Sequence, residues 1–262
     1  MTRGKLLLLA AGLVLVTAVG FFVLRGTRSK DTPGDIIIQA LQADSLSRPP
    51  ARRSRIAPKP PDPSAIPELV RDTSWRTRLS AASALAEHPE IPAKRRAEMV
   101  LDALTQEVAM PAPAPPPAGS YLPLTGVIRL HYVHMIEDLG ADAADPARTA
   151  MGQESGPARE WASIAFGASG AKDATPILRE LLRSSSEADV RMSAAYFLGR
   201  LGDRSAVDDL KRALSDPATA QVNSKDSGRP RRTFYPVREQ AAGALKNLGL
   251  KIQRTGDTFT AN

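Results

Sequence analysis

The chain of 262 residues carries a formal net charge of +7 and contains 22 prolines and no cysteine. This length accommodates one medium-sized domain with additional segments, and the proline content is too high for a uniformly compact helical protein. The lack of cysteine excludes disulfides, thiolate zinc sites and a cysteine nucleophile.

The first segment, residues 1–30, contains an uncharged apolar run of 19 residues from Leu6 to Leu24 between basic flanks. As a helix this run is about 28 Å long, close to the thickness of the hydrocarbon core of a bilayer. A cleaved signal peptide has a shorter apolar core and a small-residue cleavage site, and no such site follows Leu24. The sequence therefore predicts a single-pass N-terminal membrane anchor, in preference to a removed signal or a buried core helix.

The side of the membrane is harder to predict, because two basic residues precede the apolar run and three follow it. A large soluble part follows this N-terminal segment, which is the arrangement of an exported, anchored protein. We therefore expect the soluble part to be extracytoplasmic.

Residues 31–71 are rich in proline and basic side chains, which predicts an extended linker. Residues 1–71 hold 11 basic and 5 acidic residues, or +6 of the total of +7, whereas the rest of the chain holds 24 and 23. The near-neutral remainder weighs against a nucleic-acid partner. In a cytoplasmic protein, the linker arginines would suit anionic lipid head groups; they include Arg52, Arg53 and Arg55.

Residues 72–252 contain a repeated unit: arginine, ten residues, then glycine. The copies are Arg129 to Gly140, Arg159 to Gly170, Arg191 to Gly202 and Arg238 to Gly249, and Arg78 begins a further copy that has Pro89 in place of glycine. The arginines are 51, 30, 32 and 47 residues apart (129−78, 159−129, 191−159, 238−191). This spacing predicts five helical hairpins with a period near thirty, two insertions at 110–124 and 218–236, and a polar tail at 253–262.

The fourth unit has the clearest pattern. In the helix expected from Arg191 to Leu201, small and apolar residues share one face, and Gly202 ends the helix. Asp203 to Ser205 supplies N-cap chemistry for a second helix, which Asp216 and Pro217 follow.

This pattern, VR-x-x-AA-x-x-LG-x-LGD-x-x-AV-x-x-L-x-x-AL, resembles the short HEAT repeat of the phycobilisome-lyase type. The positions that match run from Val190 to Leu214, and Val237 to Gly249 repeat the first half. The resemblance implies an all-α fold, an α-solenoid of about five HEAT-like hairpins. It also implies a scaffold more than a catalyst, with a chromophore lyase or chaperone as the alternative function.

The second unit departs from this pattern because Tyr132 stands where other units have a small residue. We expect this helix to approach the first unit less closely than the later units approach one another. Together with the proline-rich insertion at the same junction, Tyr132 predicts a break or bend between the first unit and the other four.

Catalytic signatures are missing: the sequence has no G-x-S-x-G, no P-loop and no glycine-rich dinucleotide turn. His131, His134 and Asp138 share a helix face at a spacing that suits a metal, but such a set is more often a solvated surface. We therefore expect the protein to have no enzymatic activity, no cofactor, no bound metal and no small-molecule substrate.

Two sets of residues are candidates for binding a protein or peptide partner, because aromatic and basic side chains anchor protein interfaces. The second and fifth positions of successive units would form an apolar patch flanked by histidines, unless they pack as a satellite core. That set comprises Trp161, Ile164, Tyr196, His131 and His134. The second set lies in the second insertion and comprises Arg229, Arg231, Arg232, Phe234 and Tyr235. The alternative for this insertion is a disordered excursion that binds no partner. The sequence thus predicts a membrane-tethered scaffold or adaptor.

Overall fold

The computed structural model describes residues 61–110, 124–222 and 232–262. The predicted anchor, most of the predicted linker and most of the first insertion lie outside these residues. No helix within the described ranges is long and apolar enough to span a bilayer.

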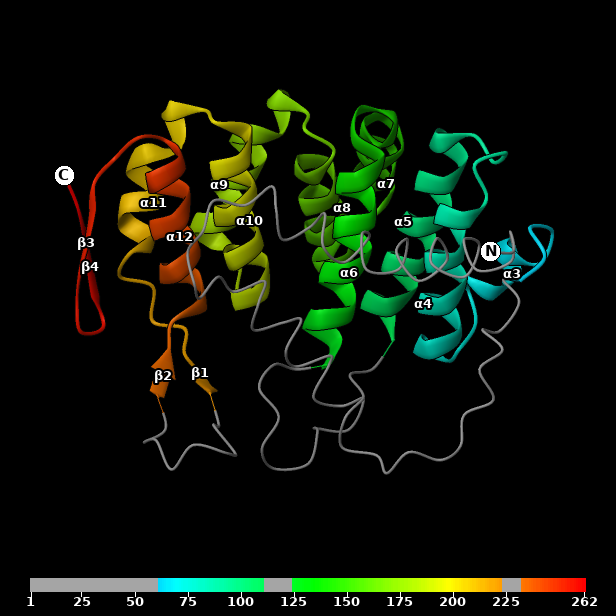
Figure 1. The fold of residues 1–262 in the computed structure, drawn as a ribbon, viewed down its shortest axis with the longest axis horizontal. Helices are drawn as coiled ribbons and strands as arrows, with labels where there is room; N and C mark the ends of the chain where they lie inside the picture. The colour runs from blue at the N-terminus through cyan, green and yellow to red at the C-terminus, as the bar shows by residue number, and fades with distance from the viewer. Residues whose placement is uncertain (1–60, 111–123, 223–231) are drawn as a thin grey trace, which may run out of the picture. The chain divides into compact units, whose positions relative to one another are not determined.

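The described residues fold mainly into helical hairpins that follow one another in chain order (Figure 1). The first helices of the five units are α4 (Trp75–Ala84), α6 (Leu124–Leu139), α8 (Gly156–Ala168), α10 (Ala188–Leu201) and α12 (Pro236–Asn247). The second helices are α5 (Ala93–Ala109), α7 (Ala144–Gln153), α9 (Thr175–Ser184) and α11 (Val207–Ala213). A short 3₁₀ turn lies between the two helices of each of these four pairs, at Leu85–Glu87, Gly140–Ala143, Lys172–Ala174 and Arg204–Ala206. The described chain is mainly helical, as predicted, and its helices alternate in the order expected for five units, the fifth of which has no second helix.

The unit glycine ends the first helix because it adopts a left-handed conformation that other residues avoid. Gly202 has φ +72° and its N–H donates to the Leu198 carbonyl. The glycines at the same position of three other units also have positive φ, namely Gly140, Gly170 and Gly249. Next, the Asp203 side chain accepts a hydrogen bond from the Ser205 N–H, which is the predicted cap.

Small residues let α10 and α12 pack backbone against backbone. Ala194, Ala195 and Leu198 are completely buried on α10. A Cβ atom at Gly199 would lie 2.6 Å from the Ala244 Cα of α12, so no side chain fits between the two helices there. The predicted close approach of the later units is confirmed at this seam.

The unit arginine joins loops to helices in the same way in the first and fourth units. Arg78 Nη1 donates to the carbonyls five and six residues earlier, at 3.0 and 2.6 Å. Arg191 Nη1 does the same, at 3.2 and 2.9 Å. Each guanidinium also binds a carboxylate near the end of its unit's second helix, Glu107 for Arg78 and Asp216 for Arg191. The repeated arginine is thus a structural clamp within the hairpin.

Helix α6 lies outside a regular row. The first unit's second helix, α5, contacts α6, α7 and α8, while α4 has little contact with α6. The large residue at the junction, Tyr132, is fully buried and so leaves no open gap. Its ring lies near the buried ion pair of Arg78 and Glu107. The first unit therefore joins the stack mainly through α5.

The two ends of the stack differ from the expected linker and tail. A short helix α3 (Ile66–Leu69) lies in the range predicted as linker, and Ile66 and Val70 are completely buried, so packing begins before residue 71. The tail forms an antiparallel ribbon of β3 (Ile252–Thr255) and β4 (Thr258–Ala261), which contacts α12 and buries Phe259. A second ribbon, β1 (Ala220–Val222) and β2 (Arg232–Phe234), extends beyond the end of α12 (Figure 1).

Candidate partner-binding site

The predicted apolar surface patch is not present, because Trp161 and Ile164 are completely buried. The first helices α6 and α10 both pack against α8, and side chains of α6 and α10 contact each other. Arg129 of α6 binds the Glu187 carboxylate 3.2 Å away, beside the start of α10, and the Trp161 indole N–H donates to the same oxygen at 3.4 Å. The prediction that these two residues contact a partner was therefore wrong, and the alternative of a packed core describes them.

The other members of that set lie where α6 contacts α10. Tyr196 is half-buried, and the His134 ring meets it edge-on with centroids 6.3 Å apart. His134 Nδ1 lies 3.0 Å from one Glu137 carboxylate oxygen, and Arg200 of α10 binds the other at 2.9 Å. These side chains join the second unit to the fourth, and His131 remains exposed beside them.

His131, His134 and Asp138 are the set that was weighed as metal ligands against a solvated surface. Among the described residues no three His, Asp or Glu side chains are grouped so that they hold a metal ion. His134 is instead engaged with Glu137 and Tyr196, and burial followed by the charge of Glu137 raises the pKa of Asp138 above its usual value.

The candidates of the second insertion are only partly described. Arg229 and Arg231 lie outside the described residues, and Arg232 pairs with Val222 through the β1–β2 ladder. Phe234 and Tyr235 are half-exposed. The Arg238 guanidinium, which belongs to the fifth unit, lies 3.9 Å above the Tyr235 ring, so this aromatic side chain is held against the stack.

A cavity of about 620 Å³ lies between the C-terminal ends of the second helices α9 and α11. We call it the arginine groove. Its lining includes Leu182, Arg183, Arg191, Arg212, Asp216 and Pro217. The groove is therefore built from adjacent repeat units, with cationic side chains from both second helices and from α10.

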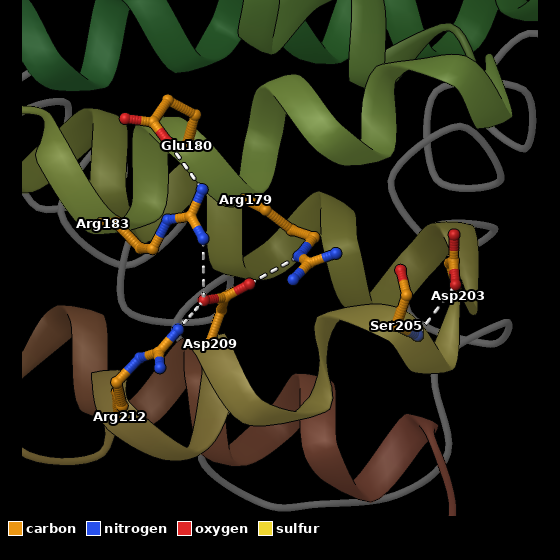
Figure 2. A network of polar contacts seen from close by, with 7 residues as sticks. All are labelled: Arg179, Glu180, Arg183, Asp203, Ser205, Asp209 and Arg212. Carbon is orange, nitrogen blue, oxygen red and sulfur yellow. Dashed lines mark hydrogen bonds and ion pairs between the residues drawn. The ribbon is translucent and has the colours of Figure 1, made fainter.

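One wall of the arginine groove is organised around Asp209, whose side chain is completely buried (Figure 2). Its carboxylate accepts hydrogen bonds from Arg179 Nε at 2.5 Å and from Arg212 Nη2, and Arg183 Nη1 lies 3.6 Å away. Burial alone would raise the pKa of Asp209, but the hydrogen bonds from Arg179 and Arg212 hold it below its usual value. The ionised carboxylate thus fixes three arginines from two helices.

A second wall of the groove contains the ion pair of Arg191 and Asp216. The two side chains form a bidentate pair, with Nε to Oδ2 at 2.7 Å and Nη2 to Oδ1 at 3.1 Å. Burial would raise the pKa of Asp216, but the Arg191 hydrogen bonds lower it. Since Arg191 Nη1 also binds two loop carbonyls, this wall is rigid and has little capacity for a further ligand.

The exposed arginines, by contrast, retain free donors. Arg212 has a side chain that is 65% exposed, and within the described residues its hydrogen bond goes to Asp209 alone. Arg183 is 44% exposed and binds Glu180 at 2.6 Å through Nη2. A guanidinium has five N–H donors, so several point to solvent at the mouth of the groove.

Sequence reasoning missed these residues, although a signal for them exists. Arg183 follows Glu180 by three positions and Arg212 follows Asp209 by three, which is the spacing of neighbours on a helix surface. Both arginines stand near the ends of second helices in adjacent repeats, and stacked repeats bring such ends together. The search concentrated on the first helices, where the repeat pattern is strongest.

Comparison with known families supports the repeat assignment. Residues 129–224 match the family described as HEAT repeats. This range runs from the second unit through the fourth and contains the arginine groove. A comparison with curated proteins gives no match. The match covers the second to fourth units; a helical hairpin of α4 and α5 precedes it, and the single helix α12 follows it.

Proposed function

We propose that this protein is a membrane-tethered scaffold whose HEAT-like repeats bind a protein or peptide partner. In this proposal the apolar run from Leu6 to Leu24 anchors the chain, the proline-rich segment after it acts as a spacer, and the repeats lie on the extracytoplasmic side. The protein performs no catalytic step. Its contribution is to hold the partner close to the membrane surface.

The observation that carries the proposal is the arginine groove inside the region that matches HEAT repeats. Repeats of this kind stack so that equivalent helices present a continuous surface, and proteins built from them use that surface to bind partners. The groove supplies a concave site with exposed cationic side chains on rigid helices, which is what recognition of an extended partner requires.

A direct test is the isolation of the full chain from its native membrane after brief cross-linking. We expect one protein to be recovered in near-equal amount, and the two purified components to bind each other when mixed again. The matched control is residues 1–71 fused to an unrelated soluble domain, which retains the predicted anchor and linker. Equal recovery of the partner by this control, or no partner with the full chain, would contradict the scaffold.

The membrane part of the proposal has its own test. The full chain should stay with membranes during alkaline extraction, and Leu13→Arg with Val16→Arg should release it because two charges in the apolar run oppose insertion. A reporter placed after Asn262 that works only outside the cytoplasm should be active. Activity of a cytoplasmic reporter instead would overturn the extracytoplasmic location and favour binding of anionic lipid by Arg52, Arg53 and Arg55.

A further inference from the structure

We propose that the arginine groove binds an acidic segment of the partner protein, with an Asp or Glu carboxylate held by Arg212 and Arg183. This inference rests on the proposed scaffold function and specifies the chemistry of its partner. The segment lies extended between the ends of α9 and α11, with the carboxylate at the exposed guanidinium groups.

The first argument comes from the hydrogen-bond donors of the two exposed guanidinium groups. Within the described residues Arg212 donates a hydrogen bond to Asp209, and it has most of its side chain in solvent. Arg183 reaches Glu180 and Asp209 and is also exposed. Both guanidinium groups belong to the lining of one cavity. Charge-assisted hydrogen bonds to a carboxylate are the strongest use of such donors, and they are most specific when more than one donor is positioned beforehand.

The second argument comes from charge balance. The network in Figure 2 contains Arg179, Arg183 and Arg212 against Asp203, Asp209 and Glu180, so its charges balance. The Arg191–Asp216 pair is neutral as well. A bound group of charge −1 therefore meets less repulsion from Asp209 and Asp216 than a phosphate of charge near −2 does, so the lining favours a carboxylate.

The third argument comes from preorganisation. Asp209 is completely buried and holds the arginines of both helices, so the cost of ordering long side chains is largely met before binding. Buried Leu182 and Ala213 and exposed Pro217 contribute apolar surface to the same cavity. The groove therefore suits an acidic residue with an apolar neighbour more than an isolated charge.

The test uses the full chain in a non-ionic detergent and a fluorescein-labelled peptide in which two Glu alternate with Leu. We expect saturable binding, and Arg183→Gln with Arg212→Gln should raise the Kd at least about tenfold, since hydrogen bonds to charged groups are strong. The matched control is Arg95→Gln with Arg148→Gln, which removes two exposed arginines that are also ion-paired, on α5 and α7. It should change the Kd less than about twofold, because the charge removed is the same but lies outside the groove.

Three results would overturn the inference. Equal weakening by both double variants would mean that the peptide responds only to net charge. Equal binding of a peptide with Gln in place of Glu would exclude carboxylate recognition. Tighter binding of the peptide with phosphoserine in place of Glu would assign the groove to phosphate.

A second measurement locates the peptide without any substitution. Phenylglyoxal modifies exposed arginines, and mass spectrometry maps the modified positions. The Glu peptide should protect Arg183 and Arg212 and leave Arg95 reactive; protection of all three or of none would contradict the site. The single variant Arg212→Gln, at the most exposed member of the network, keeps the test valid if the double variant does not fold. If the peptide fails to bind while the natural partner is still recovered, the inference fails and the scaffold stands.

Discussion

Two junctions between neighbouring helices of the stack differ in the side chains that fill them. Between α10 and α12 the contact is made by small residues, and Gly199 brings one backbone against Ala244 of the other. At the junction of α4, α5 and α6 the core contains the buried ion pair of Arg78 and Glu107 beside Tyr132. Small residues thus allow the close approach of α10 and α12, whereas the junction of α4, α5 and α6 accommodates the bulky Tyr132.

The largest effect is expected at the polar junction. Glu107→Gln leaves the guanidinium of Arg78, which is 1% exposed, without its counter-charge, and breaking a buried ion pair on one side costs about 3–5 kcal/mol. The matched control is Glu98→Gln, which breaks the exposed pair with Arg95 on the same helix and should cost less than about 1 kcal/mol.

Urea unfolding of the full chain, followed by circular dichroism, measures both changes. A small change for Glu107→Gln would mean that the carbonyls bound by Arg78 already balance its charge. The contrast between the two junctions would then lose its energetic basis.

The apolar junction is tested with one substitution at two glycines. Gly199→Ala places a Cβ 2.6 Å from the Ala244 Cα and should destabilise the fold by about 1–3 kcal/mol, because two backbones have to separate. Gly243→Ala on α12 has no atom within 4 Å of the added methyl group and should be neutral or stabilise by up to about 1 kcal/mol. Equal effects from both would show that helix propensity, and not packing, controls this seam.

The sequence predicted one of these contacts better than the others, and the reason is physical. The sequence indicated the seam because Ala194, Ala195 and Gly202 recur in register, and such a pattern reports local helix contacts directly. It did not indicate that side chains of α6 and α10 contact each other, since that contact joins units that are not adjacent. Trp161 and Ile164 were for this reason placed on the surface. Likewise, the arginine groove depends on how far apart the ends of α9 and α11 lie, which the spacing along one chain does not determine.

The polar junction also predicts a response to alkaline pH. Burial, followed by the charge of Glu107, raises the pKa of Tyr132 to about 12, whereas an unfolded tyrosine titrates near 10. Between these two values the unfolded state loses its proton first, so stability falls as pH rises, by about 1.4 kcal/mol per unit at most. Tyr132→Phe should remove this loss.

Near pH 7 Tyr132→Phe should change the unfolding free energy little, because the Tyr132 hydroxyl lies near Arg78 but makes no hydrogen bond of normal geometry among the described residues. The measurement is the difference in unfolding free energy between the two proteins at pH 7 and pH 11. The pKa of Tyr196 is also raised, but Tyr196 is present in both proteins, so its effect cancels when their unfolding free energies are subtracted. Parallel pH curves for the two proteins would mean that Tyr132 ionises as easily in the folded state as in the unfolded one.

The smallest effect on stability is expected away from both junctions, at the second insertion. Val222 pairs with Arg232 across the β1–β2 ribbon, so replacing residues 223–231 by Asn-Gly joins the strands with a two-residue turn and keeps their register. No contact of the seam between α10 and α12 is removed, so helicity and melting temperature should stay unchanged. If Arg229 and Arg231 contribute to a partner interface, as the sequence predicts, the same variant should bind the recovered partner less tightly. Unchanged partner affinity would remove the insertion from the interface, while a lower melting temperature would show that the segment supports the stack through Phe234 and Tyr235.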